Sequence, residues 1–151
     1  MDDGLSIQER FLPDTTCFGC GPANARGLRL RSFPGDGAVV ATFRPWPEHD
    51  NGLGYLNGGI IATVLDCHSA AAMLLEADAR GWRAQGEAVV PYVTAGLDIR
   101  FRRPAPLDEP SELRAVIAAA DAAEMTVDVE LVWDGKPRAV ATALWKRWRP
   151  R

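Results

Sequence analysis

Two adjacent glycines, Gly58 and Gly59, begin a long apolar segment and limit what this chain can fold into. A helix that starts at these glycines has unpaired N–H groups in its first turn, and these attract negative charge. Because glycine lacks a Cβ, another group can approach the backbone closely here. Asp66 lies about two turns further along and is the only carboxylate between Asp50 and Glu76. The segment therefore predicts a helix that carries one isolated acid.

This predicted helix is apolar on nearly every side. At about 100° per residue, Asp66 falls roughly opposite the main apolar stripe, among small uncharged residues. A helix that is apolar all round is usually buried. We therefore expect Asp66 to face a protein or ligand surface, and a helix cap or an ion pair with an Arg is the alternative. The main stripe consists of Ile60, Ile61, Val64, His68, Ala71, Ala72 and Leu75.

Length and composition fit a single globular domain. The 151 residues are 47% hydrophobic and 25% charged, as in proteins that build one core. The formal net charge is −3, and we expect no nucleic-acid partner because such proteins usually present a basic surface.

The expected compartment is the cytoplasm. The first residues, Met1-Asp2-Asp3-Gly4, are acidic and lack the apolar core of a signal peptide. No apolar run approaches the roughly 20 residues that cross a bilayer, so we expect no membrane partner. The three cysteines are expected to be thiols.

Most of the remaining chain predicts β-strands, so the fold class is α+β with about six mainly antiparallel strands around one helix. The run Pro34-Gly35-Asp36-Gly37 predicts a hairpin turn between the first two strands, and Asp134-Gly135 predicts another before the last. The helix is expected to end near Gly81, before the third strand. The expected strands cover residues 28–33, 38–43, 88–103, 113–120, 125–133 and 138–148.

The third predicted strand alternates with a period of two. Side chains of one set are apolar and those of the other set are polar or charged, which predicts one buried and one exposed face. The apolar set is Leu97, Ile99 and Phe101, and the polar set is Thr94, Asp98, Arg100 and Arg102.

Three segments together resemble the hotdog-fold acyl-CoA thioesterases of the phenylacetate-pathway type. They are residues 57–66 (NGGIIATVLD), residues 94–105 (TAGLDIRFRRPA) and residues 17–28 (CFGCGPANARGL). The resemblance implies one sheet wrapped around a long helix, and a homodimer with two active sites at its interface. It also implies that dimers can pair into homotetramers. Residues 17–148 would form the single domain, with 1–16 as an N-terminal extension and 149–151 as a tail.

The same resemblance implies roles for individual residues. Asp66 would be the general base toward water or the nucleophile on the thioester carbonyl, and the Gly58 N–H would polarise that carbonyl. Asn51 would help to hold the water or the carboxylate, and Thr94 would orient the water across the interface. Asn57 stands where the family usually has His, so this residue cannot titrate. The residues expected to contact substrate are Gly59, Ser69, Arg102 and Arg103.

No cofactor is expected, because coenzyme A would be part of the acyl-CoA substrate. Thioester hydrolysis builds negative charge on the carbonyl oxygen, so fixed N–H donors lower its barrier. A carboxylate removed from water becomes a better base, because its pKa rises. Arginines suit the phosphates of coenzyme A, although solvated charge on an edge strand is the common alternative.

The sequence predicts structural roles for the cysteines and the histidines. Cys17 and Cys20 have the spacing of zinc ligands, but no second Cys or His pair follows, so we predict a structural loop and no metal. Cys67 adjoins Asp66, and a helical step of about 100° is expected to point it elsewhere. His68 is expected to be a satisfied core residue and His49 a turn residue.

Two other functions remain open from the sequence. The first is a hotdog protein that binds acyl-CoA without turnover, which the Asn at position 57 favours. The second is a hotdog hydratase or dehydratase, which needs a catalytic His and acid that the two histidines do not supply.

Overall fold

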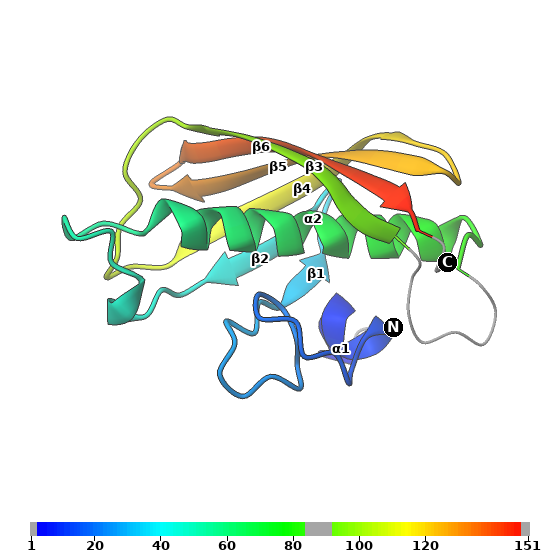
Figure 1. Ribbon diagram of the computed structural model, residues 1–151, viewed down its shortest axis with the longest axis horizontal. Coiled ribbons are helices and arrows are strands. Elements are labelled where there is room, and N and C mark those ends of the chain that lie inside the picture. The colour runs from blue at the N-terminus through cyan, green and yellow to red at the C-terminus, as the bar shows by residue number, and fades with distance from the viewer. Residues whose placement is uncertain (1–2, 84–91, 149–151) are drawn as a thin grey trace.

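One long helix lies against one face of a six-stranded antiparallel sheet in the computed structural model, which describes residues 3–83 and 92–148 (Figure 1). The strand order is β1-β2-β4-β5-β6-β3. This architecture confirms the predicted fold class. The elements are α1 (Ile7–Phe11), β1 (Ser32–Pro34), β2 (Val39–Phe43), the 3-10 helix η1 (Pro47–His49), α2 (Gly58–Ala79), β3 (Tyr92–Phe101), β4 (Ser111–Ala120), β5 (Glu124–Trp133) and β6 (Lys136–Arg147).

Helix α2 begins and ends close to where the sequence predicts. The Asn57 side-chain oxygen accepts hydrogen bonds from the backbone N–H groups of Gly59 and Ile60, and so caps the first turn. After Ala79 the chain turns at Gly81, whose φ of +70° lies in the left-handed region that glycine tolerates. Local chemistry therefore defines both helix ends.

The core lies between α2 and the concave face of the sheet. Strands β4, β5 and β6 alternate buried and exposed side chains over much of their length, as expected for a sheet covered on one face. Each fully buried Leu or Val contributes roughly 1.5–3 kcal/mol of transfer free energy. The fully buried apolar residues include Val64, Leu65, Ala71, Ala77, Val127, Leu131, Ala139 and Ala143.

The helix α2 also corrects one sequence-based expectation. Gly58–Ala79 is 22 residues long, with a mean hydropathy of 1.5 in its most apolar window, so it is long and apolar enough to cross a membrane. The expectation that no apolar segment is long enough to cross a bilayer was therefore wrong. Length and hydropathy do not distinguish a membrane helix from a core helix, and α2 packs on the sheet here.

A buried polar network joins α1, β1, α2 and β2. The Gln8 amide exchanges two hydrogen bonds with Ser32, whose hydroxyl is 2.9 Å from His68 Nδ1. His68 Nε2 donates to the Val39 carbonyl at 2.9 Å, so Nδ1 is the acceptor in the neutral ring. Burial lowers the pKa of His68 to about 4. His68 is thus a satisfied core residue, as predicted.

Residues that the sequence assigned to an N-terminal extension take part in this core. Ile7 and Gln8 are 2% and 1% exposed, and the helix that carries them contacts both α2 and β1. The Ser6 side chain caps α1 and forms a reciprocal pair with Glu9. Part of the segment 1–16 therefore belongs structurally to the domain.

Strand β1 is shorter than predicted. The expected strand covered residues 28–33, but the ladder to β2 begins at Ser32. Before it, the N–H groups of Leu28 and Leu30 donate to the carbonyls of Phe18 and Gly19. The intervening Arg29 has a positive φ of 52°, which breaks the strand. This segment therefore pairs with the loop that carries Cys17 and Cys20.

A β-bulge changes the faces of β3. The ladder to β6 pairs Thr94 with Trp145 and then Gly96 with Leu144, which leaves one extra residue between them. Thr94 consequently points toward α2 on the same side as Leu97, although strict alternation placed it on the opposite face. The predicted start of this strand, residues 88–91, lies outside the described residues.

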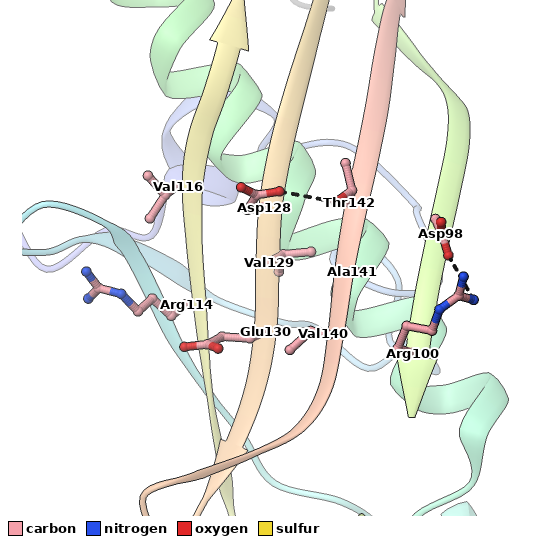
Figure 2. A pocket seen from close by; sticks show the side chains of 10 residues that line it. All are labelled: Asp98, Arg100, Arg114, Val116, Asp128, Val129, Glu130, Val140, Ala141 and Thr142. Carbon is pink, nitrogen blue, oxygen red and sulfur yellow. Dashed lines mark hydrogen bonds and ion pairs between the residues drawn. The ribbon is translucent and has the colours of Figure 1, made fainter. Parts of the chain in front are cut away.

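The outer face of the sheet carries a shallow groove with charges of both signs (Figure 2). Asp98 and Arg100 of β3 form an ion pair at 3.3 Å, and Thr142 donates to Asp128 at 3.2 Å. Asp98 and Arg100 point outward as predicted. Helix α2 lies on the other face, so this groove is separated from Asp66 by the sheet.

Candidate active site

Asp66 lies at the wall of a cavity of about 580 Å³ between α2, β3 and the N-terminal loop. Its Oδ1 accepts a hydrogen bond of 2.8 Å from the hydroxyl of Thr94. The rest of the wall is mostly apolar and includes Met73, Tyr92 and Trp145. The helix and the bulged strand thus place a carboxylate and a hydroxyl together beside an apolar space.

The environment of Asp66 disfavours its charged form. Burial is the main cause that raises the pKa of Asp66, and the nearby Cys17 charge acts in the same direction, while the Thr94 hydrogen bond opposes both. Within residues 3–83 and 92–148, no ion pair includes Asp66. The alternative role of an acid paired with an Arg therefore has no support in the described chain.

The first turn of α2 has one available donor. Asn57 uses its side-chain oxygen to bind the N–H groups of Gly59 and Ile60, whereas no described residue accepts from the Gly58 N–H. Gly58 lines a second groove, of about 340 Å³. A Cβ at Gly58 would lie 3.5 Å from the ring of Phe101, in ordinary contact. The Gly59 amide, expected to contact substrate, is instead used by the cap.

Gly58 and Asp66 cannot act on the same carbonyl within one chain. Eight residues separate them on one helix, which corresponds to about 12 Å at 1.5 Å per residue. They also line different cavities. One chain thus presents two separate groups: a carboxylate with a hydroxyl at one cavity, and a free N–H at the helix start beside the other.

Two other predicted site residues have structural contacts. Asn51 lines the groove of Gly58, and its side-chain oxygen accepts from the N–H groups of Leu53 and Tyr55. Ser69 is fully buried; its hydroxyl donates to the Asp66 carbonyl and accepts from Trp145 Nε1. The expectation that Ser69 contacts substrate is therefore wrong for this structure, because its side chain has no exposed surface.

Arg102 and Arg103 line the same groove as Gly58. Their backbone N–H groups both donate to the Arg138 carbonyl, which fixes the start of the loop after β3. No carboxylate in the described ranges forms an ion pair with either guanidinium. Both side chains are exposed and can meet an anion.

The three cysteines meet beside Asp66, although the sequence predicted that Cys67 would point elsewhere. The sulfur atoms of Cys17, Cys20 and Cys67 all lie within 4.8 Å of one another, and all three residues line the cavity of Asp66. Hydrogen bonds from the Cys20 and Cys67 thiols lower the pKa of Cys17, and the same contact raises the pKa of Cys20 to about 12. The fold brings Cys67 to the other two because the N-terminal loop packs on α2.

Neither histidine reaches the cavity. His49 stacks on Phe43 and Trp46, and its Nδ1 accepts from the Trp46 N–H. Burial lowers the pKa of His49. Since His68 lies in the core network, both histidines of the chain have structural roles, as the sequence predicted.

Comparison with known families decides the class of this protein. The model of the thioesterase superfamily matches residues 53–141, which include α2 with Gly58 and Asp66, β3 with Thr94, and most of the sheet. The chain belongs to the thioesterase superfamily. Comparison with the curated proteins gives no match.

Solved structures of this superfamily have the same hotdog fold. The phenylacetic acid degradation-related protein of Ralstonia eutropha JMP134 is 24% identical, with a TM-score of 0.69 over 93% of this chain and 98% of that one. A mutant of the phenylacetic acid degradation protein PaaI from Thermus thermophilus is 25% identical, with a TM-score of 0.64 over 80% and 94%. A longer thioesterase superfamily protein is 24% identical to this chain, with a TM-score of 0.64, and this chain spans 60% of its length.

Proposed function

We propose that this thioesterase superfamily protein hydrolyses an acyl-CoA thioester to a free acid and coenzyme A. The observation that carries the proposal is the Asp66 carboxylate, which accepts from Thr94 at 2.8 Å beside a largely apolar cavity. The apolar wall suits an acyl chain, and the carboxylate has no ion-pair partner among the described residues.

Asp66 would act as a general base. It removes a proton from a water molecule that attacks the thioester carbonyl carbon, and Thr94 orients the carboxylate. The carbon–sulfur bond then breaks, and the departing thiolate takes the proton from Asp66. Partial burial supports this role because it makes the carboxylate a stronger base.

A second copy of the chain would supply the oxyanion donor. The Gly58 N–H is free, but it lies about 12 Å along the helix from Asp66. Among the described strands, β3 pairs only with β6, so its outer edge is open to a partner. That strand also exposes Val93 and Phe101, at 42% and 57%. We therefore propose a homodimer, and dimers that pair again are compatible with this arrangement.

The groove lined by Gly58 would hold the coenzyme A moiety. Arg102 and Arg103 line this groove together with Gly58. Neither guanidinium forms an ion pair with a carboxylate within the described segments, so both can bind phosphate. One subunit would thus provide the phosphate contacts and the oxyanion donor. The other would provide Asp66, Thr94 and the acyl cavity.

The test measures free coenzyme A by chromatography from short, long and aryl acyl-CoAs. Chromatography is preferable to a thiol reagent, because Cys17 is exposed and would react. Asp66→Asn should lower kcat by at least about a hundredfold, the usual scale of general-base catalysis. Asp98→Asn is the matched control, since this carboxylate lies on the outer face of the sheet and should leave turnover unchanged.

Two results would contradict the proposal. The first is a wild-type protein that binds acyl-CoA but releases no coenzyme A from any substrate of the panel, which would leave the protein as a binding module. The second is full activity of Asp66→Asn. Incorporation of labelled oxygen from water into Asp66 during a single turnover would assign it as the nucleophile and contradict the general-base step.

A further inference from the structure

We propose that Cys17, Cys20 and Cys67 form a binding site for a thiophilic d¹⁰ metal ion, zinc in the first instance, next to the candidate catalytic acid. Their three sulfur atoms all lie within 4.8 Å of one another. Thiolate sulfur is the commonest zinc ligand in structural sites. The inference does not depend on the proposed thioesterase activity, because the ligands are the cysteines alone.

The distance between two of the sulfur atoms matches that of two ligands on a tetrahedral ion. With zinc–sulfur bonds of about 2.3 Å, two ligands of a tetrahedron lie about 3.8 Å apart. The observed distance between the sulfurs of Cys17 and Cys67 is 3.7 Å. A single ion can therefore bind both of these sulfurs, and the Cys20 sulfur lies within 4.8 Å of each.

Two elements hold the cluster in place. Cys17 and Cys20 lie on one loop with a two-residue spacing. Backbone hydrogen bonds fix this loop, since the Gly21 N–H donates to the Cys17 carbonyl and the Leu30 N–H donates to the Gly19 carbonyl. The third ligand comes from the rigid helix α2, which the loop closely approaches.

Gly19 allows this close approach. A Cβ at position 19 would lie 2.3 Å from the Cys67 sulfur and 3.0 Å from Thr63 Cγ2, so any other residue would displace either the loop or the Cys67 side chain. The sequence therefore has a glycine where the loop with two ligands must touch the helix with the third.

Because all three cysteines line the cavity, a fourth coordination position would be open to it. Asp66 lines the same cavity but is not part of the sulfur cluster, and its Oδ1 already accepts from Thr94. A solvent molecule from the cavity would complete the tetrahedron. Such a site has three protein ligands and one open position, whereas a structural zinc site usually has four protein ligands.

The experiment measures metal content of the full-length protein. Protein expressed in zinc-supplemented medium and purified without chelator should contain about one zinc per chain, as measured by inductively coupled plasma mass spectrometry. Cys17→Ser and Cys67→Ser should each lose most of this zinc. Met73→Leu is the matched control, because Met73 lies on the same helix and lines the same cavity without a thiolate, and it should retain the metal.

A second measurement needs no substitution. Apo protein titrated with cobalt should develop thiolate-to-cobalt charge-transfer absorption that saturates at about one equivalent. Because the chain has only three cysteines, all three thiols should also become unreactive to a thiol reagent when zinc is bound. Cys17 is exposed, so Cys17→Ser should fold even if Cys67→Ser does not.

Three results would overturn the site. One is less than about a tenth of an equivalent of zinc after supplementation, with all three thiols reactive. Another is zinc that remains in both Cys→Ser variants. The third is a disulfide in the freshly isolated protein, detected as a loss of two hydrogen masses and one remaining thiol.

Discussion

Ser32→Ala should strongly destabilise the fold, because Ser32 connects the buried network between α1, β1 and α2. The substitution leaves the Gln8 amide without its acceptor at 3.0 Å and His68 Nδ1 without its partner at 2.9 Å. A buried polar group that loses its partner costs about 1–3 kcal/mol, so the loss of two partners should lower the free energy of unfolding by about 2–6 kcal/mol. Urea unfolding at neutral pH, followed by tryptophan fluorescence, measures this loss.

Ser111→Ala provides the matched control with the opposite expectation. Ser111 is also fully buried, but its hydroxyl has no hydrogen-bond partner in the described structure. Its removal should leave stability unchanged or increase it by up to about 2 kcal/mol. Equal losses in the two variants would refute the reasoning, because serine volume rather than hydrogen bonding would then determine stability.

Other predictions concern the helix cap, the site and acid stability. Asn57→Ala should lower the free energy of unfolding by about 1 kcal/mol in urea, and an unchanged midpoint would contradict the capping role. Thr94→Val should lower kcat for acyl-CoA hydrolysis about tenfold or more with little change in KM, and unchanged kcat would remove the hydroxyl from the mechanism. His68 has a pKa of about 4 in the fold against 6.5 when unfolded, so only the unfolded chain gains this proton as the pH falls from 6.5 to 4. The free energy of unfolding, measured by urea titration with a chelator present to keep the protein free of metal, should therefore decrease by about 3 kcal/mol over that pH window. The same titrations of His68→Gln should show a weaker dependence on pH.

The sequence predicted those features that depend on local patterns. The glycines at positions 58 and 81 mark the two ends of α2, and the Asp134-Gly135 turn separates β5 from β6. Asp66 was recognisable because a lone carboxylate in an apolar helix needs an explanation. His68 was correctly placed in the core because it lies on the main apolar stripe.

The remaining features depend on contacts between distant segments. The third cysteine lies 47 residues after Cys20, and only the packing of the N-terminal loop on α2 brings them together. The burial of Ser69 depends on Trp145, which belongs to the last strand. A sequence search for a third cysteine on a helix that follows the Cys17-x-x-Cys20 motif could have found Cys67. The spacing in the sequence does not show, however, that the Cys67 side chain points toward the other two.

The bulge in β3 determines whether Thr94 faces the cavity. The extra residue between Thr94 and Gly96 exchanges the two sheet faces to which the side chains before it point. The side chains after it keep their faces. Deletion of Ala95 would therefore turn the hydroxyl of Thr94 out of the cavity while Leu97 and Ile99 stayed packed. Gain or loss of one edge-strand residue can thus add or remove a polar group at the candidate active site while the core packing is kept.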